Sequence, residues 1–476
     1  MNCAACHTRE IAVGTTSYRI DGGPAISDFQ GFLTDLDAAV GQLLAEPTRF
    51  QSFATDVLGS PPTDGQIDQL RAEVQAWFKP YDLIVRKGLP ATNPWGPAHL
   101  DAVGMIFDRL TGLDIGPAPD YIIGDNVRTA DAPVRYPFLW NASRQSLTQW
   151  PGFSANGNDQ AALGRNTGEV FGVFARFHPS QDSKNFPLIK IDYTSINSSD
   201  TQGLMKLENL IKQMGPPKWQ WPTDPALVAK GQALFNLPKE QGGCAECHTN
   251  SPPASGTWPT PLWDVGTDNR EYVMIGVPGR ADWPGWQAYT GLLNGAPTLG
   301  QVGPLQPIAS SLAVLQTAVI GTILEGGGGA SDQVEVGHQS NLAAPGVDAQ
   351  DARLQEMTTV FRRSAAADDA QPFKYEARVL YGIWAAAPYL HNGSVPTLED
   401  LLNPVSERPK SFKVGPAYDP VKVGLAADQT AFDYTLATTG CDGDQRTSGN
   451  SNCGHEWGTT LTPDQKRALL EYLKTL

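Results

Sequence analysis

The sequence predicts a mainly α protein of two domains, with long irregular loops connecting helices of modest length. Apolar residues recur at helical spacing in several stretches of the chain. Glycine and proline, at 48 and 38 residues, are frequent enough to indicate long irregular connections. A CxxCH motif occurs once in each half, as CAACH at residues 3–7 and as CAECH at residues 244–248.

CxxCH is the attachment signature of c-type haem. The two thiols bond covalently to the haem vinyl groups, and the adjacent histidine takes one axial position on the iron. A zinc site would pair the two CxxC units around one ion, but each unit already has its own histidine. A redox dithiol is the other alternative. We therefore expect two covalently bound haems and two cytochrome c-like haem domains; the cofactor-binding residues are Cys3, Cys6 and His7, and Cys244, Cys247 and His248.

Two amphipathic helices are expected in the first half, at residues 27–46 and 64–78. Pro80 is predicted to end the second helix, because proline lacks the N–H that a helix interior needs. Their apolar stripes are expected to be core. These stripes comprise Phe29, Phe32, Leu33, Leu36, Val40, Leu43 and Leu44 in the first helix and Ile67, Leu70, Val74, Trp77 and Phe78 in the second.

The segment GPPKWQW, at residues 215–221, separates the two halves. We therefore expect an N-terminal haem domain at residues 1–215 and a C-terminal cytochrome c-like domain at residues 222–476. In the second, residues 224–235 begin with Asp and Pro at helix-start positions and lead into CAECH. Thr462 and Gln465 form a capping box that begins a C-terminal helix. This pair matches the crossing helices of a cytochrome c domain.

Charge and hydropathy exclude two classes of partner. The chain has 35 basic and 50 acidic residues, a formal net charge of −15, and no block of Lys or Arg. Nucleic acid would be repelled. The longest uncharged stretch, residues 308–324, contains polar residues and is shorter than the ~20 residues of a membrane span. A buried or groove-lining helix is expected there.

Cys441 and Cys453 lie in a polar loop without a metal-ligand pattern. A disulfide between them is the preferred interpretation, and two free thiols are the alternative. Bacterial haem attachment takes place outside the cytoplasm, so we expect a periplasmic or secreted protein. The chain shows no secretory signal before CAACH, and we therefore expect an N-terminal segment to be missing from it.

The segment FKYEARVLYGIWAAAPYLHNGSVPTLEDLL, at residues 373–402, resembles the APY(M/L)HNGSxxTLE segment of bacterial di-haem cytochrome c peroxidases. ALFN before the second motif and APVRYPFLWN in the first half extend this resemblance. NCAACHT, ERPKSFKVGPAYDPVKVG and GNSNCGHEWGT resemble more closely the rubber oxygenase-like branch of that superfamily. The resemblance implies a haem-dependent oxidoreductase with a catalytic N-terminal haem and an electron-transfer or tuning C-terminal haem.

Seven histidines are available for up to four axial positions. In the peroxidases, a methionine just before the histidine of the HNGS segment usually binds the electron-transfer haem, but Leu390 stands there. Leucine cannot bind iron, so His391 becomes the preferred distal ligand of the second haem. His455 is the alternative ligand, and a hydrogen-bonded loop histidine is the alternative role for His391. His338 is expected to be a surface residue.

The first haem has only His99 and His178 as candidate second ligands within its domain, and neither lies in a recognisable ligand motif. An iron bound by His7 alone would leave an open face for peroxide or dioxygen.

Two kinds of distal pocket are implied by the resemblance. A peroxidase would use Glu169 as the acid–base that moves a proton between the two peroxide oxygens; an exposed structural carboxylate is the alternative. A rubber oxygenase would use an apolar, aromatic pocket. One of its tryptophans would assist electron transfer, and an ordinary core cluster is the alternative. The aromatic candidates are Phe138, Trp140, Trp150 and Phe153.

Two classes of function follow. The first is an oxidoreductase that uses peroxide or dioxygen, with an apolar alkene substrate or a small redox protein as electron donor. The second is a passive electron carrier in which both irons are six-coordinate. The missing second ligand in the first domain favours the enzyme.

Overall fold

The computed structural model describes residues 3–59, 61–182, 184, 190–250, 256–276, 285–298, 304–326, 373–441 and 446–476. His338 lies outside these residues. The helices are α1 (Phe29–Ala45), α2 (Pro47–Leu58), α3 (Asp64–Gly88), α4 (Ala102–Phe107), α5 (Asp159–Gly172), α6 (Thr201–Ile211), α7 (Pro225–Phe235), α8 (Arg270–Ile275), α9 (Ser311–Glu325), α11 (Leu398–Leu401) and α12 (Pro463–Leu473). A π-helical segment, Asp108–Asp114, continues α4.

The strands are short and form antiparallel pairs rather than one sheet. The pairs are β1 (Thr8–Val13) with β2 (Thr16–Asp21), β3 (His99–Leu100) with β4 (Val134–Arg135), β5 (Leu147–Thr148) with β6 (Ser154–Ala155), β7 (Ser180–Gln181) with β8 (Ile191–Asp192), β9 (Leu262–Asp264) with β12 (Lys374–Glu376), β10 (Gln287–Tyr289) with β11 (Ile308–Ser310), β13 (Ser411–Lys413) with β16 (Thr435–Ala437) and β14 (Tyr418–Asp419) with β15 (Gly424–Leu425).

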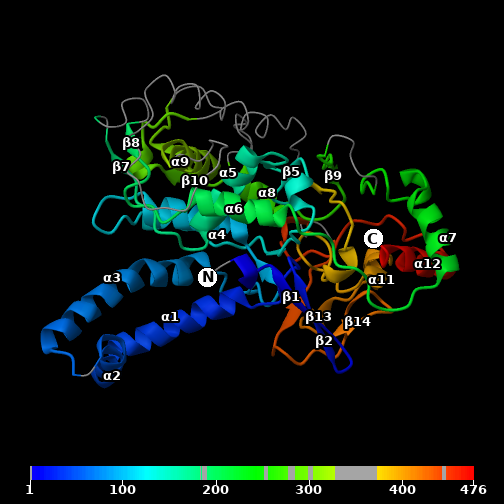
Figure 1. The fold of residues 1–476 in the computed structure, drawn as a ribbon, viewed down its shortest axis with the longest axis horizontal. Coiled ribbons are helices and arrows are strands. Elements are labelled where there is room, and N and C mark those ends of the chain that lie inside the picture. The colour runs from blue at the N-terminus through cyan, green and yellow to red at the C-terminus, as the bar shows by residue number, and fades with distance from the viewer. Residues whose placement is uncertain are drawn as a thin grey trace.

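Helices α1, α2 and α3 form an arm that projects from the rest of the molecule, with α2 at its tip (Figure 1). Asp28 caps α1, and a Thr63–Gln66 capping box begins α3, so both helices start close to the predicted residues. The predicted end at Pro80 is wrong, because α3 continues to Gly88. Tyr81 and Ile84, beyond the proline, are buried in a hydrophobic cluster, and this burial offsets the lost hydrogen bond.

The apolar stripes of the arm are only partly core. Phe29 and Leu33 of α1 and Ile67 of α3 are buried, as predicted. Phe32 and Trp77 are instead 52% and 48% exposed. The helices of the arm pack mainly against each other and not around a globular core. Each apolar stripe is wider than the surface that its neighbouring helix covers, so some of its side chains face solvent.

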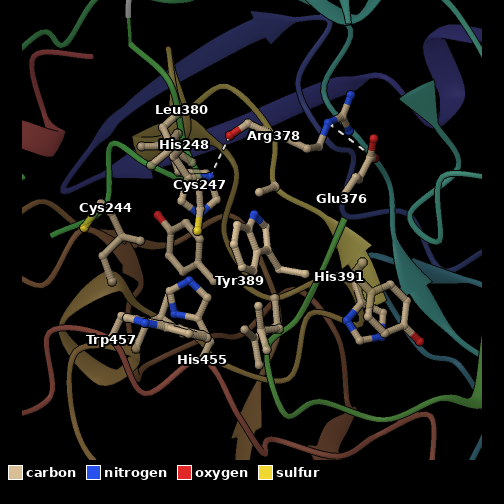
Figure 2. A pocket seen from close by; sticks show the side chains of 18 of the residues that line it. Cys244, Cys247, His248, Glu376, Arg378, Leu380, Tyr389, His391, His455 and Trp457 are labelled. Carbon is tan, nitrogen blue, oxygen red and sulfur yellow. Dashed lines mark hydrogen bonds and ion pairs between the residues drawn. The ribbon is translucent and has the colours of Figure 1, made fainter. Parts of the chain in front are cut away.

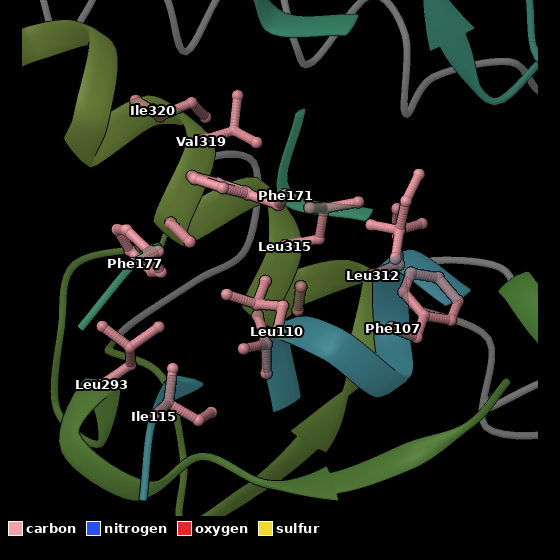
Figure 3. Close-up of a cluster of buried hydrophobic side chains, with 14 of the residues drawn as sticks. Phe107, Leu110, Ile115, Phe171, Phe177, Leu293, Leu312, Leu315, Val319 and Ile320 are labelled. Atoms are coloured by element: carbon pink, nitrogen blue, oxygen red, sulfur yellow. The ribbon is translucent and has the colours of Figure 1, made fainter. Parts of the chain in front are cut away.

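The largest hydrophobic cluster surrounds α9 (Figure 3). Leu312, Leu315 and Val319 of α9 contact Leu110 and Phe171 from the first half of the chain. Residues 311–324 of α9 are almost all buried, which confirms the buried helix expected near residues 308–324. No helix in the described part of the chain has the length and apolar character that a bilayer crossing requires.

A second hydrophobic cluster lies beside α7 and α12, and it too combines both halves of the chain. Ile11, Phe138 and Trp140 from the first half pack with Trp384 and Leu469 from the second. Each of the two large cores therefore draws residues from both sides of the boundary expected at residues 215–222. The two cytochrome c-like haem domains remain a prediction.

Helices α7 and α12 pack closely against each other next to CAECH, as predicted for the helix pair of the second half. Asp224 caps α7, and the Thr462–Gln465 capping box begins α12. Gly231 lies where the helices touch, and a Cβ at this position would collide with the carbonyl oxygen of Ala468. A glycine is therefore required for this close approach.

The predicted disulfide between Cys441 and Cys453 is present, with the two Cα atoms 5.3 Å apart.

Gly231→Ala is expected to destabilise the protein by about 1–3 kcal/mol, because the added methyl group must push the two helix backbones apart. The matched control is Gly215→Ala, since a Cβ at Gly215 meets no atom within 4 Å. Urea unfolding of both variants at the same haem loading measures the difference. Equal midpoints for the two variants would contradict the close helix contact.

Candidate haem-binding sites

The two CxxCH motifs fold in the same way. The backbone N–H groups of Cys6 and His7 donate to the carbonyl of Cys3, at 3.3 and 3.0 Å. In the second motif, the N–H groups of Cys247 and His248 donate to the carbonyl of Cys244, at 3.2 and 2.8 Å. One tight turn therefore brings two thiols and one imidazole together in each motif.

All four motif thiols are free rather than paired in disulfides. Burial raises the pKa of Cys6 to about 11 and the pKa of Cys244 to about 12. A raised pKa opposes the thiolate form that zinc binding and disulfide exchange require. In the described part of the chain, no three His, Cys, Asp or Glu side chains are arranged to hold a metal ion. The raised thiol pKa values argue against a zinc site and against a redox dithiol, and covalent attachment of two haems stays a prediction.

Each motif histidine is held by a backbone carbonyl that lies 130 residues further along the chain. Nδ1 of His7 donates to the carbonyl of Pro137 at 2.9 Å, and Nδ1 of His248 donates to the carbonyl of Arg378 at 2.7 Å. Because Nδ1 carries the proton, Nε2 is left unprotonated and able to bind iron. Burial lowers the pKa of His7 to about 4 and also lowers the pKa of His248, which keeps both rings neutral.

The second motif opens into a cavity (Figure 2). Cys244, Cys247 and His248 line one part of it, and Trp457 and His455 lie on the side opposite His248. The apolar lining suits a porphyrin ring, which is mostly hydrophobic. It comprises Leu380, Ile383, Leu390, Leu398, Leu401, Leu402, Leu469 and Leu473.

His455 faces His248 across this cavity, with the two ring centroids 6.2 Å apart. Two imidazoles on opposite sides of one metal ion would have their centroids roughly 6 Å apart, since each metal–nitrogen bond is about 2 Å. Burial is the main cause that lowers the pKa of His455 to about 3, so His455 is neutral and able to bind a metal. The residues present therefore fit a haem between His248 and His455.

His391, the preferred distal ligand from the sequence, lines the same cavity but is held in another way. Its Nε2 lies 3.1 Å from a carboxylate oxygen of Asp268. Its ring stacks on Tyr375 with the centroids 3.7 Å apart, and the Tyr375 hydroxyl donates to Asp268 at 3.3 Å. Because the Nε2 of His391 is engaged by a carboxylate while His455 lies across from His248, the geometry favours His455, the alternative ligand, and the ligand role of His391 stays a prediction.

Glu169 lies close to the first motif, and its role as an acid–base at a first haem stays a prediction. Its charge contributes to the raised pKa of Cys6, and the side chain of Gln149 donates a hydrogen bond to it. Burial raises the pKa of Glu169 itself. Arg165, on the same helix α5, contributes to the lowered pKa of His7. Helix α5 therefore places one positively charged residue, Arg165, and one acidic residue, Glu169, near CAACH.

The two histidines considered as further ligands of the first haem are engaged elsewhere. Nδ1 of His99 is bonded to the carbonyl of Pro97 at 2.8 Å, and its ring lies against Gly393. His178 stacks on Tyr121, with the centroids 3.9 Å apart. In the described part of the chain, no imidazole faces His7 in the way that His455 faces His248.

The four aromatic candidates do not form one pocket. Phe138 and Trp140 stack with their centroids 4.8 Å apart, and both are buried in the second hydrophobic cluster. Phe138 and Trp150 line the cavity of the second motif. Phe153 packs instead against the cluster around α9. Two of the four residues thus line the cavity of the second motif, and an aromatic pocket at the first haem stays a prediction.

Several site residues were not found from the sequence. Arg135, Glu376 and Arg378 line the second cavity, Asp268 holds His391, and Gln149 bonds Glu169. Arg135 lies within APVRYPFLWN, and Glu376 and Arg378 lie within FKYEARVLYG, so both segments had been recognised without their charged residues being singled out. The charged residues within these two segments were the signal that could have identified them, whereas their burial depends on tertiary packing.

Residues 374–413 match the protein family described as RoxA-like, cytochrome c-like. The whole chain is 28% identical to an uncharacterized protein, y4iJ, of Sinorhizobium fredii (strain NBRC 101917 / NGR234), and the match covers 76% of that protein. A second uncharacterized protein of this strain, y4iM, is 26% identical over 71% of the chain and 63% of its own length. The family match supports a relation to RoxA-like c-type cytochromes and implies a haem cofactor. The resemblance to di-haem peroxidases stays a prediction.

His455→Ala should convert the second haem from low-spin to high-spin, because it removes the imidazole that faces His248. His391→Ala should leave this haem low-spin, since it removes a partner of Asp268 rather than an iron ligand. Optical and EPR spectra of the two haem-loaded variants measure the difference. The opposite pattern would return the ligand role to His391.

Proposed function

We propose that this chain is a di-haem c-type cytochrome oxidoreductase with two unlike haem sites. The first haem, on Cys3 and Cys6 with His7, is open to peroxide or dioxygen. The second, on Cys244 and Cys247, lies between His248 and His455 and transfers electrons or tunes the first. The observation that carries the proposal is this asymmetry. The two motif histidines are held by equivalent carbonyl bonds, but among the residues that the structure describes only His248 has a facing imidazole.

A short route through packed groups connects the two motif histidines. His7 is bonded to Pro137, and the next residue, Phe138, lies under the guanidinium of Arg378 at 4.8 Å. The backbone carbonyl of Arg378 holds His248. The charge of Arg378 also contributes to the lowered pKa of His7. Such closeness supports electron exchange between the two sites.

At the first site, the chain would position one axial ligand and one proton-transfer group. Haem bound there supplies redox chemistry toward peroxide or dioxygen. His7 would hold the iron through Nε2, and its bond to the carbonyl of Pro137 fixes the orientation of the ring. Glu169 has a raised pKa from burial and is oriented by Gln149. A carboxyl group of this kind can deliver a proton to one oxygen of the oxidant and take it back.

The alternative is a passive electron carrier with both irons six-coordinate. It would need a second ligand at the first haem, and the contacts of His99 and His178 argue against either one. The proposal includes a periplasmic or secreted location, in keeping with the disulfide Cys441–Cys453 and with c-type haem. An apolar alkene is the proposed substrate of the oxygenase form, and a small redox protein is the electron donor of the peroxidase form.

Cyanide or imidazole should change the spectrum of one haem and leave the other unchanged, because in the proposed arrangement the first iron has an open face and the second lies between two imidazoles. Titration of the oxidised, haem-loaded protein, followed optically and by EPR, measures this. His7→Ala should abolish turnover of peroxide and of a polyisoprene-like alkene. If neither haem binds the added ligands and neither substrate is turned over, the oxidoreductase proposal is wrong and the protein is a passive electron carrier.

Glu169→Gln should reduce peroxide turnover by ~10²–10⁴-fold if this carboxyl is the acid–base group. The matched control is Glu73→Gln, which changes an exposed carboxylate on α3. Steady-state peroxide consumption by both variants provides the comparison. A nearly silent Glu169→Gln together with measurable oxygen uptake in the presence of an alkene would exclude the peroxidase form and support the oxygenase.

A further inference from the structure

The cavity of the second motif contains a buried arginine with an unused donor. Arg135 lines this cavity and is 5% exposed. Its Nε donates to the carbonyl of Leu390 at 2.9 Å, but its Nη1 has no partner in the described part of the chain. A guanidinium keeps its charge at any physiological pH, and an unpaired buried donor is costly. The structure therefore points to an acceptor that the protein itself does not supply.

A second arginine converges on the same end of the cavity. The guanidinium of Arg135 lies 4.7 Å from the Trp150 ring centroid, and that of Arg378 lies 5.4 Å from the same centroid. Burial, with the nearby charge of Arg378 next, lowers the pKa of Arg135 to about 9. Both arginines are buried and pack on the same Trp150 ring, and two buried like charges that act on each other favour a neighbouring anion.

Glu376, the acidic residue at this end of the cavity, pairs with Arg378 but leaves Nη1 of Arg135 without a hydrogen-bond acceptor in the described residues. Glu376 lies 3.6 Å from Arg378, and one of its buried carboxylate oxygens has no partner in the described residues. Burial raises the pKa of Glu376 to about 7, so a fraction of these carboxyls is neutral near pH 7 and able to donate a hydrogen bond. Glu376 can thus contribute a donor beside an anion instead of competing with it.

The cavity has a charged end, where Arg378 and Glu376 lie, and the thiol of Cys244 lies away from it. A line from His248 to His455 passes between the two. In Figure 2, Cys244 is at the left of this line, whereas Glu376, Arg378 and His391 are at its right. A c-type haem is attached through its vinyl groups, and its two propionate carboxylates project from another edge of the ring. With the vinyl edge at the cysteines, the propionate edge is directed to the arginines.

We propose that Arg135 and Arg378 form the binding site for the propionate carboxylates of the second haem. This inference rests on the proposed di-haem function. Arg378 belongs to the second half of the chain, but Arg135 lies on β4 in the first half. Its backbone N–H also donates to the carbonyl of His391 at 2.9 Å, which fixes its position against the second half. The N-terminal half therefore completes the site of the haem that is attached to the C-terminal half.

Arg135→Gln in the haem-loaded full chain tests the proposal. It should shift the propionate bending bands in the resonance Raman spectrum of the low-spin haem. It should also lower the midpoint potential of that haem, because a nearby positive charge stabilises the reduced form. Arg135→Lys, which keeps the charge, should shift the potential less. Arg144→Gln, at an exposed arginine, is the matched control and should change neither signal.

Arg378→Gln is a second variant, because it removes the guanidinium but keeps the backbone carbonyl that holds His248. If both variants retain the low-spin haem with unchanged propionate bands and potential, the arginine site is wrong while the di-haem function stands. If mass spectrometry finds no haem on the peptide that contains Cys244 and Cys247, the proposed function itself fails. A shift in either glutamine variant that is absent from Arg144→Gln supports the site.

Discussion

The bond from each motif histidine to a distant backbone carbonyl is the interaction on which both candidate sites depend. CxxCH alone brings two thiols and an imidazole together, but it does not fix which ring nitrogen is free. Pro137 and Arg378 do so, each 130 residues after its histidine. The carbonyl group cannot donate, so Nδ1 must carry the proton and Nε2 is left unprotonated and able to bind a metal. The repeated spacing shows that one arrangement is used twice in this chain.

The two copies differ in what surrounds the free nitrogen. Around His248, leucines form an apolar cavity and His455 closes the opposite side. Around His7, helix α5 contributes Glu169 near the thiol of Cys6. A facing imidazole favours a filled coordination sphere and electron transfer, whereas a buried carboxyl favours proton transfer to a small ligand. The two histidine–carbonyl bonds are alike, but the residues around them differ. This difference is the physical basis for proposing that the first haem reacts with the oxidant and the second transfers electrons.

Local sequence signals predicted the motifs, the disulfide and several helix starts, because each depends on residues a few positions apart. Thr462 with Gln465 and Asp224 with Pro225 are such cases. The choice between His391 and His455 could not be made in this way. Both follow loops whose course depends on tertiary packing, and the Asp268 that engages His391 is distant in sequence. Tertiary packing also decides the place of Trp150, which lines the cavity of the second motif. At Pro80, burial of the residues that follow keeps α3 helical in spite of a helix-breaking residue.

The most direct test of two c-type haems in one chain is the haem content of the full-length protein after maturation in a host that attaches haem outside the cytoplasm. A pyridine haemochrome assay with peptide mapping by mass spectrometry would count and locate the haems. We expect two per chain, one on the peptide with Cys3 and Cys6 and one on the peptide with Cys244 and Cys247. Replacement of Cys244 and Cys247 by Ala should leave one. A wild-type chain with zero or one haem would contradict the di-haem assignment.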